Sequence, residues 1–487
     1  MGRRGFASFR APMWKGLLRQ RWPWLTAMAL VVAAFLLTNV FHFHFGGDED
    51  TRPRGGAAEI EALRQRKDVN LLFIVIDTLR ADRLSSYGYA RPTSPLLDAI
   101  ASRGVRFARQ LSQSSWTKCS MASLWTSTLP VRTRITRFDS VIPAAAHMPA
   151  EVLREAGFRT AGIWRNGWVA PSFGFGQGFE IYDRPVSARP PASVRRDNPT
   201  VQEGGTDEDG IRAAIEFLRV RGPGERWFLY LHMMDVHEYT YDEDSARFGS
   251  TYSDVYDNAV LRVNLLLDRL FGELAERGLL DHTLVAISSD HGEAFGEHGA
   301  EGHARNVYRE VTVVPWIVSF PFRLEPGLVI DSHTTNLDVW PTLLDLLGLP
   351  IPDGVDGRSR VPEIVAAARG EPAPADDRPV FAHLDQFWGQ RDVEPTPTVA
   401  VIEGDYRYIE TALPRGATPR EELFDDTTDA RERRDLLASD PERAARLREL
   451  AHGYLATAPA PWAEQTGKLE LNELELNQLR ALGYAVP

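Results

Sequence analysis

The stretch VNLLFIVID (residues 69–77) decides the fold, because it is a largely apolar run that ends in an acid. Such a run is typical of a central strand that is buried on both faces of a sheet. In doubly wound sheets, ligands bind at the carboxyl ends of the strands, and Asp77 falls at that point. An acid after a strand is also an ordinary helix cap, so the role of Asp77 depends on its neighbours.

A second stretch, TLVAISSDHG (residues 283–292), has the same pattern of an apolar run followed by an acid, here Asp290. His291 and a glycine that permits a tight turn follow it. Two such strand ends can converge on one cation. Asp77, Asp290 and His291 supply oxygen and nitrogen ligands suited to Zn²⁺, Mn²⁺, Mg²⁺ or Ca²⁺. A third predicted strand, residues 227–232, leads into Asp235 and His237, for which loop capping is the alternative role.

The length and composition of the chain predict one large α/β domain and a smaller subdomain. With 487 residues, of which 43% are hydrophobic, the chain can bury a large core. Apolar residues at helical spacing predict helices that pack on the sheet, and residues 363–378 read as a flexible connection. The predicted scaffold consists of helices at 211–218, 254–277 and 441–455, a strand at 313–320, and a small antiparallel sheet at 379–384 and 398–409.

The N-terminal segment predicts a membrane anchor. Residues 24–45 are mostly apolar and long enough for a tilted spanning helix. Residues 1–23 carry six basic residues and no acid, and acids follow the apolar run, so the positive-inside rule places the N-terminus in the cytoplasm. A cleaved signal peptide is the alternative, but no A-x-A-like site follows the run. Residues 46–67 read as a short linker.

Charge and cysteine content limit the partners and the chemistry. The formal net charge is −12 although the N-terminal segment is basic, so the remainder is more acidic still and a nucleic-acid partner is not expected. Cys119 is the only cysteine, which excludes an intrachain disulfide and leaves the redox compartment open. The sequence predicts no protein partner.

Several blocks, in order along residues 69–437, resemble the sulfatase-like family of the alkaline phosphatase superfamily. Each block alone is weak, but the ordered set is specific. The blocks are DTLRADRL from Asp77, Tyr87-Gly88, SPLLD from Ser94, SDHGEAFGEHG from Ser289, DVWPTLLDLLG from Asp338, and ELFD from Glu422. The resemblance implies a large sheet sandwiched by helices, a metal-dependent ester hydrolase activity and a smaller C-terminal α+β subdomain.

The family's reactive residue lies at the start of a helix, and in true sulfatases it is a Cys or Ser in C/S-x-P/A-x-R that is oxidised to formylglycine. Cys119 does not fit this motif, because Met121 and Ser123 stand where Pro or Ala and Arg are required. Aligning Thr126–Pro130 with the family's T-G-x-x-P places Thr117 in the nucleophile position. A metal bound to the Thr117 oxygen would lower its pKa and produce an alkoxide. An ordinary helix N-cap is the alternative role for Thr117.

The resemblance also implies further site residues. His237 and His303 lie where the family places groups that touch the anion or protonate the leaving group, for which an imidazole is suited. Asp235 and Arg132 are expected to bind substrate. Asp235, His237 and His303 could instead hold a second metal ion, and the sequence leaves this open.

Three functions follow from these residues. The first is a metal-dependent hydrolase or transferase of phosphate or sulfate esters that uses a Thr117 alkoxide outside the cytoplasmic membrane. The second is a true sulfuric ester hydrolase, and the third is a non-catalytic binding protein of the same fold. The catalytic domain is expected at residues 68–362, and the C-terminal subdomain with its tail at residues 379–487. The substrate itself is not predicted, because specificity in such folds lies in surface loops.

Overall fold

The computed structural model describes residues 50–185, 205–222, 224–374, 376–390, 393–414, 417–470 and 476. The chain divides into one unit of residues 1–51 and one of residues 52–487. The predicted basic segment 1–23 and the predicted anchor 24–45 therefore lie outside the described residues. Among the residues that are described, no helix combines the length and the apolar character needed to cross a membrane.

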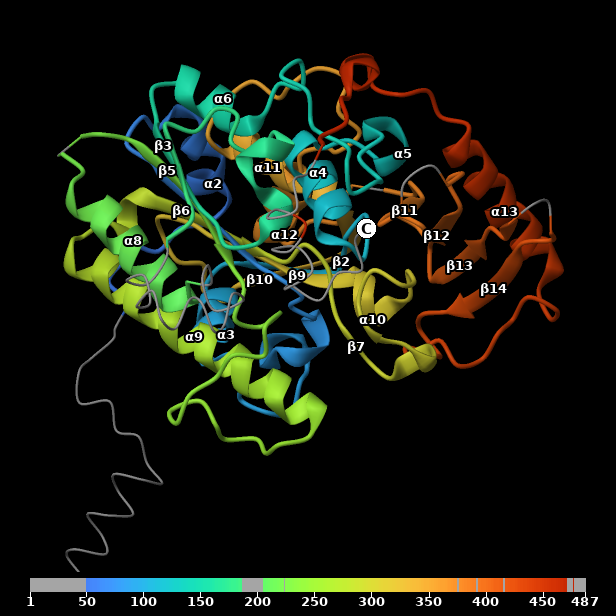
Figure 1. Cartoon of the computed structure of the whole chain (residues 1–487). Coiled ribbons are helices and arrows are strands. Elements are labelled where there is room, and N and C mark those ends of the chain that lie inside the picture. Colours follow the sequence, from blue (N-terminus) through green and yellow to red (C-terminus); the bar gives the residue numbers. More distant parts are fainter. Residues whose placement is uncertain are drawn as a thin grey trace, which may run out of the picture. The chain divides into compact units, whose positions relative to one another are not determined.

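A large eight-stranded sheet forms the centre of the second unit (Figure 1). Its strand order is β10-β2-β9-β6-β1-β5-β3-β4, and β9 runs antiparallel to both of its neighbours. The central strand β1 pairs in parallel with β5 and β6. The strands are β1 (Asn70–Ile76), β2 (Val105–Leu111), β3 (Arg159–Ile163), β4 (Ile181–Asp183), β5 (Trp227–Met233), β6 (Thr283–Ser288), β9 (Val313–Ser319) and β10 (Leu328–Thr335).

Helices cover both faces of this sheet, which confirms the predicted α/β architecture (Figure 1). Successive residues of β1 alternate between the two cores, because side chains of a strand point to opposite faces. One face carries α2 (Ala57–Ala62), α4 (Thr117–Thr126), α6 (Pro149–Glu155), α11 (Val339–Leu346) and α12 (Val361–Arg369). The other face carries α3 (Pro95–Ser102), α8 (Asp207–Arg219) and α9 (Tyr252–Glu276).

A second, four-stranded antiparallel sheet follows in the C-terminal part of the chain. It consists of β11 (Val380–Asp385), β12 (Pro397–Glu403), β13 (Tyr406–Thr411) and β14 (Arg420–Asp425). The stretch 398–409, predicted as part of a small antiparallel sheet, contributes to both β12 and β13, which are joined by a turn at Gly404, whose φ is +58°. Helix α13 (Pro441–Leu455) packs on this sheet through a separate apolar cluster that includes Leu447 and Tyr454.

Two predicted connections are partly built into the fold. The stretch 363–378, predicted to be flexible, begins inside α12, where Ile364 is fully buried and Gly370 ends the helix in the left-handed conformation. Within the predicted linker 46–67, α2 buries Ile60 against the core. In both segments a few apolar side chains among many polar ones pack in the core. The average composition of a segment does not reveal such packing.

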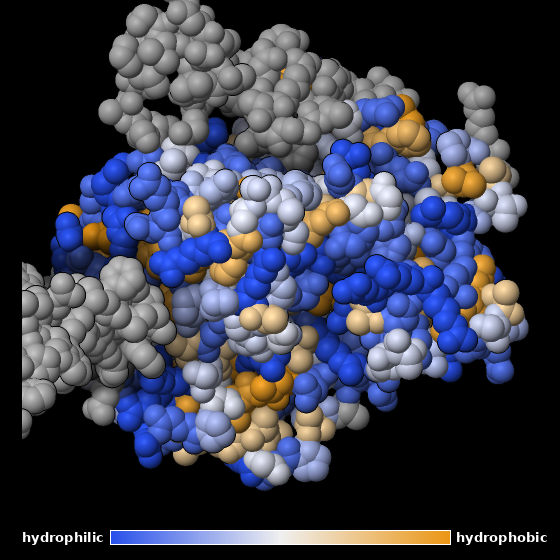
Figure 2. All heavy atoms as spheres, turned by 90° about the horizontal axis from the view of Figure 1, so that it is seen from below, coloured by the Kyte–Doolittle hydropathy of each residue, from blue (hydrophilic) through white to orange (hydrophobic). Residues whose placement is uncertain are grey.

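The topology places the carboxyl ends of β1, β5 and β6 side by side, because these strands are parallel neighbours. Short elements then carry the chain around this edge: α5 (Pro130–Thr133), β7 (Ala294–Phe295), β8 (Glu301–Gly302) and α10 (Arg309–Thr312). On the face in Figure 2, the hydrophobic side chains of the described residues form small separate areas among hydrophilic ones. The polar residues that follow these strands form the candidate site.

Candidate metal and catalytic site

Asp77 follows β1 and is held by two hydrogen bonds to one of its oxygens. Asn166 Nδ2 donates to Asp77 Oδ2 at 2.6 Å, and His232 Nε2 lies 3.1 Å from the same oxygen. The other oxygen, Oδ1, is buried and has no hydrogen-bond partner. The next residue, Thr78, has a φ of +59°, which a β-branched residue rarely adopts, and this bend turns the chain away directly after the carboxylate.

Asp290 follows β6 and presents a similar pair of oxygens. Its Oδ1 accepts hydrogen bonds from the backbone N–H groups of His291 (3.0 Å) and Thr78 (3.3 Å). Its Oδ2 is buried and has no hydrogen-bond partner. Two carboxylates at neighbouring strand ends thus each use one oxygen for positioning and leave the other unsatisfied, which is costly in a buried place.

His291 directs a nitrogen lone pair at these two oxygens. Its Nδ1 lies 3.0 Å from the carbonyl oxygen of Gly292, so we assign the proton to Nδ1 and the lone pair to Nε2. Nε2 lies 3.3 Å from Asp290 Oδ2 and 3.9 Å from Asp77 Oδ1. Three acceptor atoms therefore face one another without a proton among them.

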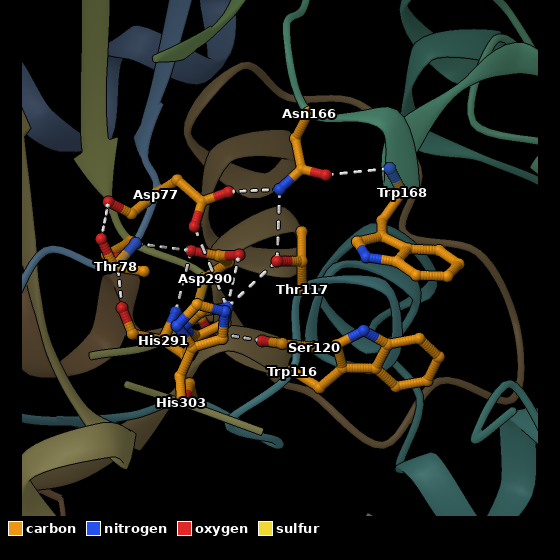
Figure 3. A network of polar contacts seen from close by, with 12 residues as sticks. Asp77, Thr78, Trp116, Thr117, Ser120, Asn166, Trp168, Asp290, His291 and His303 are labelled. Carbon is orange, nitrogen blue, oxygen red and sulfur yellow. Dashed lines mark hydrogen bonds and ion pairs between the residues drawn. The ribbon is translucent and has the colours of Figure 1, made fainter. Parts of the chain in front are cut away.

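Thr117 completes the group from the opposite side, at the first position of α4 (Figure 3). Its Oγ1 lies 3.1 Å from His291 Nε2 and 3.3 Å from Asn166 Nδ2. The side chain is fully buried. The structure thus brings together all four residues that the sequence predicted as metal ligands.

These four residues fit a divalent cation. Ligands at about 2.1 Å from a tetrahedral ion lie roughly 3.4 Å apart, and the contacts of His291 Nε2 with Thr117 Oγ1 and Asp290 Oδ2 are of that length. A cation would also satisfy both orphaned oxygens. Oxygen ligands with a single imidazole suit zinc, manganese, magnesium or calcium, so the donor set supports a metal without identifying it.

His232 offers an alternative nitrogen, since Asp77, His232 and Asp290 can also gather one ligand atom each within 4.8 Å. However, Nε2 of His232 faces the oxygen of Asp77 that Asn166 already engages, and its Nδ1 lies 2.6 Å from the hydroxyl of Tyr230. Both nitrogens of His232 are thus used within the protein. We therefore assign His232 to orienting Asp77 and His291 to the metal.

His237 and His303 lie beside the group. The ring centroid of His303 is 4.5 Å from that of His291 and 4.9 Å from that of His237. Nδ1 of His303 lies 3.2 Å from a carboxylate oxygen of Glu293. Burial lowers the pKa of both histidines, that of His303 to about 4, and burial raises the pKa of Glu293 to about 7. Both histidines therefore border the group of predicted metal ligands.

Asp235 lies away from this group, contrary to its expected role. It is fully buried, and its two oxygens accept hydrogen bonds from Arg165 (2.7 Å) and Arg262 (3.0 Å). Neither oxygen remains for a substrate, and a second metal at Asp235, His237 and His303 would have to compete with both guanidinium groups. Asp235 serves instead to anchor the loop that carries His237.

Arg132 is also engaged elsewhere. Its guanidinium pairs with Asp356 and donates to the carbonyl oxygen of Gly354 at 3.2 Å. The ion pair links α5 to the turn that follows α11, which is a structural role. The structure therefore does not bring Arg132 to the predicted substrate position.

Cys119 occupies the first turn of α4 but has a different environment from Thr117. It is buried, and burial raises the pKa of its thiol to about 12, a rise that a hydrogen bond involving Ser114 opposes and the charge of Asp385 increases. A thiol held in this protonated state is a poor nucleophile.

Three contributing residues were not assigned a role from the sequence: Asn166, His232 and Glu293. Asn166 caps a short 3₁₀ turn, Gly167–Val169, by accepting from the backbone N–H of Trp168. Its position after β3 follows the same strand-end rule that found Asp77. His232 and Glu293 lie inside stretches already singled out, but only the structure shows which atoms they orient.

Comparison with known proteins finds two family profiles that match overlapping regions of the chain. The sequence profile of the sulfatase family matches residues 69–349, and that of the N-sulphoglucosamine sulphohydrolase C-terminal region matches residues 296–454. Among curated proteins, an ulvan-active sulfatase of Formosa agariphila is 23% identical over 59% of this chain and 63% of its own length. The multifunctional alkaline phosphatase superfamily protein PehA of Trinickia caryophylli is 28% identical over 55% of this chain and 49% of its own.

The match thus spans less than two thirds of the length of either curated relative. Solved structures share the fold at low identity. The phosphonate monoester hydrolase of Agrobacterium radiobacter has a TM-score of 0.63 at 19% identity, covering 80% of this chain and 95% of its own. A 2-O GAG sulfatase has a TM-score of 0.63 at 18% identity, covering 80% of this chain and 92% of its own.

Proposed function

Because the chain belongs to the sulfatase family, we propose that it is a metal-dependent hydrolase of sulfate or phosphorus esters, or a phosphoryl transferase, with Thr117 as the nucleophile. The observation that carries this proposal is the meeting of Thr117 Oγ1, His291 Nε2 and two unpartnered carboxylate oxygens in one buried place. The names of its relatives, which include sulfatases and phosphonate monoester hydrolases, support an ester of a sulfur or phosphorus oxyacid as the substrate class.

Asp77, Asp290, His291 and Thr117 would hold the cation, which is zinc, manganese, magnesium or calcium. When bound, the cation supplies positive charge that lowers the pKa of the Thr117 hydroxyl and offsets the negative charge of the ester. Asn166 and His232 fix Asp77, and the proton on Nδ1 of His291 keeps its Nε2 available. These contacts preorganise the donor atoms.

The chain's own residues then carry out the transfer. Thr117 Oγ releases its proton to solvent and attacks the central phosphorus or sulfur atom, and the bond to the leaving oxygen breaks. His303, supplied with a proton by the neighbouring Glu293 whose pKa is raised by burial to about 7, or His237 gives a proton to that oxygen. The first N–H groups and the positive dipole end of α4 would face the anionic oxygens, as at other helix N-termini. Water then hydrolyses the threonine ester in a hydrolase, whereas an acceptor alcohol takes the group in a transferase.

A true sulfuric ester hydrolase that depends on a converted Cys119 is the second candidate function. Formylglycine releases sulfate by collapse of a hemiacetal, a route that is closed to threonine. The mismatch of Met121 and Ser123 with the modification motif and the burial of Cys119 favour the threonine route. A non-catalytic binding protein is disfavoured, since it would have no use for an intact set of donors and two adjacent histidines.

The experiment is hydrolysis of a matched aryl panel by the full-length chain in detergent, with each of the four metals added. The panel comprises a sulfate, a phosphate monoester, a phosphate diester and a phosphonate monoester. Thr117→Ala should reduce turnover of the preferred ester by at least about 1,000-fold, as expected for loss of a covalent nucleophile. Cys119→Ala, on the same turn of α4, is the matched control and should retain activity. Full activity in Thr117→Ala would disprove the assignment.

We further propose that residues 24–45 anchor the chain with residues 1–23 in the cytoplasm and the catalytic unit outside, periplasmic or extracellular. The apolar run and the asymmetry of basic residues support this arrangement. Membranes from expressing cells should retain the chain after alkaline extraction. Protease added outside intact spheroplasts should degrade the catalytic unit, and complete protection would contradict the orientation.

A further inference from the structure

A cavity of about 280 Å³ lies between the loop after β8 and the C-terminal sheet. Arg305 and Asn306 line it from the loop, and Gln386, Leu413 and Arg420 line it from the region of the sheet. Its wall is therefore polar on one side and partly apolar on the other. None of these residues has a role in the site described above.

The loop that lines the cavity also contacts Ser115, close in sequence to Thr117. The backbone N–H of Ala304 donates to the carbonyl oxygen of Ser115 at 2.8 Å. The Ser115 hydroxyl donates to the carbonyl oxygen of Asn306 at 2.5 Å. Ser115 is two residues before Thr117, and Asn306 is three residues after His303. The same loop thus connects His303 to the cavity and rests on the approach to α4.

An ester bound at Thr117 has to project its leaving group past His237 and His303. Thr117, Asp77, Asp290 and His291 are completely buried, whereas His237 and His303 are partly exposed. The leaving oxygen must also lie near the histidine that protonates it. A leaving group that passes His303 would reach Arg305, which lies two residues further along the same loop.

The charged residues that line this cavity are all basic. Its lining contains two arginines and no carboxylate. Among the described residues no acid pairs with Arg305, while Arg420 contacts Glu422 and the Tyr308 hydroxyl at 3.3 Å each. A larger cavity of about 960 Å³ is lined by both arginines and acids, and Arg80 pairs there with Asp82. In the lining of the smaller cavity, Arg305 is thus the guanidinium that no acid of the described residues pairs with.

We propose that this cavity binds the leaving-group side of the substrate and that the leaving group carries an anionic group of its own. Arg305 and Arg420 would bind that second anion, a carboxylate, sulfate or phosphate, since guanidinium forks match these groups. Leu413 and the apolar wall would cover the carbon skeleton between the two anions. The proposal rests on the proposed function and specifies its substrate as an ester with two negative centres.

The test compares two aryl esters of whichever class the enzyme turns over. One has 3-hydroxybenzoate as its leaving group, and the other has the methyl ester of 3-hydroxybenzoate. The chain should prefer the free carboxylate by at least about 10-fold in kcat/KM, mainly through KM, as charge-assisted hydrogen bonds predict. Arg305→Gln and Arg420→Gln should each reduce this preference, whereas Arg434→Gln, an exposed arginine outside the cavity lining, should keep it.

Equal turnover of the two esters by the unaltered chain would overturn the proposal. It would also be overturned if Arg305→Gln lowered turnover of both esters equally, since Arg305 would then act on the transferred group. If the unaltered chain hydrolyses neither ester, the proposed function fails, and calorimetric titration with 3-hydroxybenzoate decides the inference separately. Binding that weakens in both glutamine variants would support the anion subsite, and absence of binding would refute it.

Discussion

Replacing Asp290 with asparagine is expected to stabilise the metal-free protein while destroying its response to metal. Asp77 and Asp290 present carboxylate oxygens within 4.8 Å of each other, and one oxygen of each is buried without a hydrogen-bond partner. Without a cation the two charges repel. Asparagine keeps an oxygen for the N–H groups of Thr78 and His291 and removes one charge.

The magnitude follows from that separation. Two unit charges 4.8 Å apart at an effective dielectric constant of about 20 interact by about 3 kcal/mol. The pKa of Asp290 also indicates repulsion between the two carboxylates. Burial and, after it, the charge of Asp77 raise this pKa to about 7. Because the folded-state pKa is raised, the destabilisation is absent near pH 3 and complete above about pH 7. The unfolding entropy is about 2.1 cal/mol/K per residue. Removing the repulsion of about 3 kcal/mol at pH 8 therefore raises Tm by about 3 °C.

The assay is thermal unfolding at pH 8, followed by circular dichroism, first in chelator and then with zinc or manganese. In chelator Asp290→Asn should melt above the unaltered chain, and added metal should raise the Tm of the unaltered chain only. Asp331→Asn, an exposed position on β10, is the control and should behave like the unaltered chain. The two-carboxylate site is refuted if the Tm of Asp290→Asn in chelator is lower than that of the unaltered chain. It is also refuted if metal raises the Tm of both proteins by the same amount.

Two further residues give separate predictions. Glu293→Gln should lower kcat by about 10-fold to 100-fold with little change in KM, because Glu293 orients His303; an unchanged pH profile and kcat would exclude this role. His298 is held by Glu310 and the carbonyl oxygen of Glu432, and although burial alone would lower its pKa, these hydrogen bonds raise it to about 9. Its contribution to stability is therefore complete below about pH 6.5 and lost as the pH rises through 9. The Tm difference between the unaltered chain and His298→Gln should shrink between pH 6 and pH 10, and a constant difference would contradict the ion pair.

Much of the site was predictable because it depends on strand ends. Asp77 and Asp290 each follow an apolar run, and parallel neighbouring strands bring such residues together whatever the loops do. The ordered motifs identified the family, and the family match confirms that identification. The position of Thr117 followed from the register of its helix.

The errors arose where long-range partners decide a side chain's role. Asp235 follows β5 as Asp77 follows β1, so the sequence predicted a role in the site for both, Asp77 as a metal ligand and Asp235 as a substrate-binding residue. What separates them is Arg165 and Arg262, which lie on other elements and occupy both oxygens of Asp235. Asn166 was missed for the converse reason, since a single amide after a short strand acquires its role only through Asp77 and Thr117.

Segment boundaries were misjudged for a related reason. The stretch 363–378 was predicted to be a linker from its Ala, Pro, Glu and Asp residues, yet it begins inside α12, where Ile364 and Val365 are buried in the core. Composition reports average polarity, whereas a helix needs only a narrow apolar stripe. The partner of that stripe is visible only in three dimensions.

The most direct test of the central claim is to locate the covalent intermediate. The full-length chain is mixed with its preferred aryl phosphorus ester, quenched in acid within one turnover, digested and analysed by tandem mass spectrometry. The account predicts a phosphoryl or phosphonyl group on Thr117, absent in Thr117→Ala and present in Cys119→Ala. An unmodified Thr117 together with conversion of the Cys119 thiol to an aldehyde would contradict it and establish the sulfatase route instead.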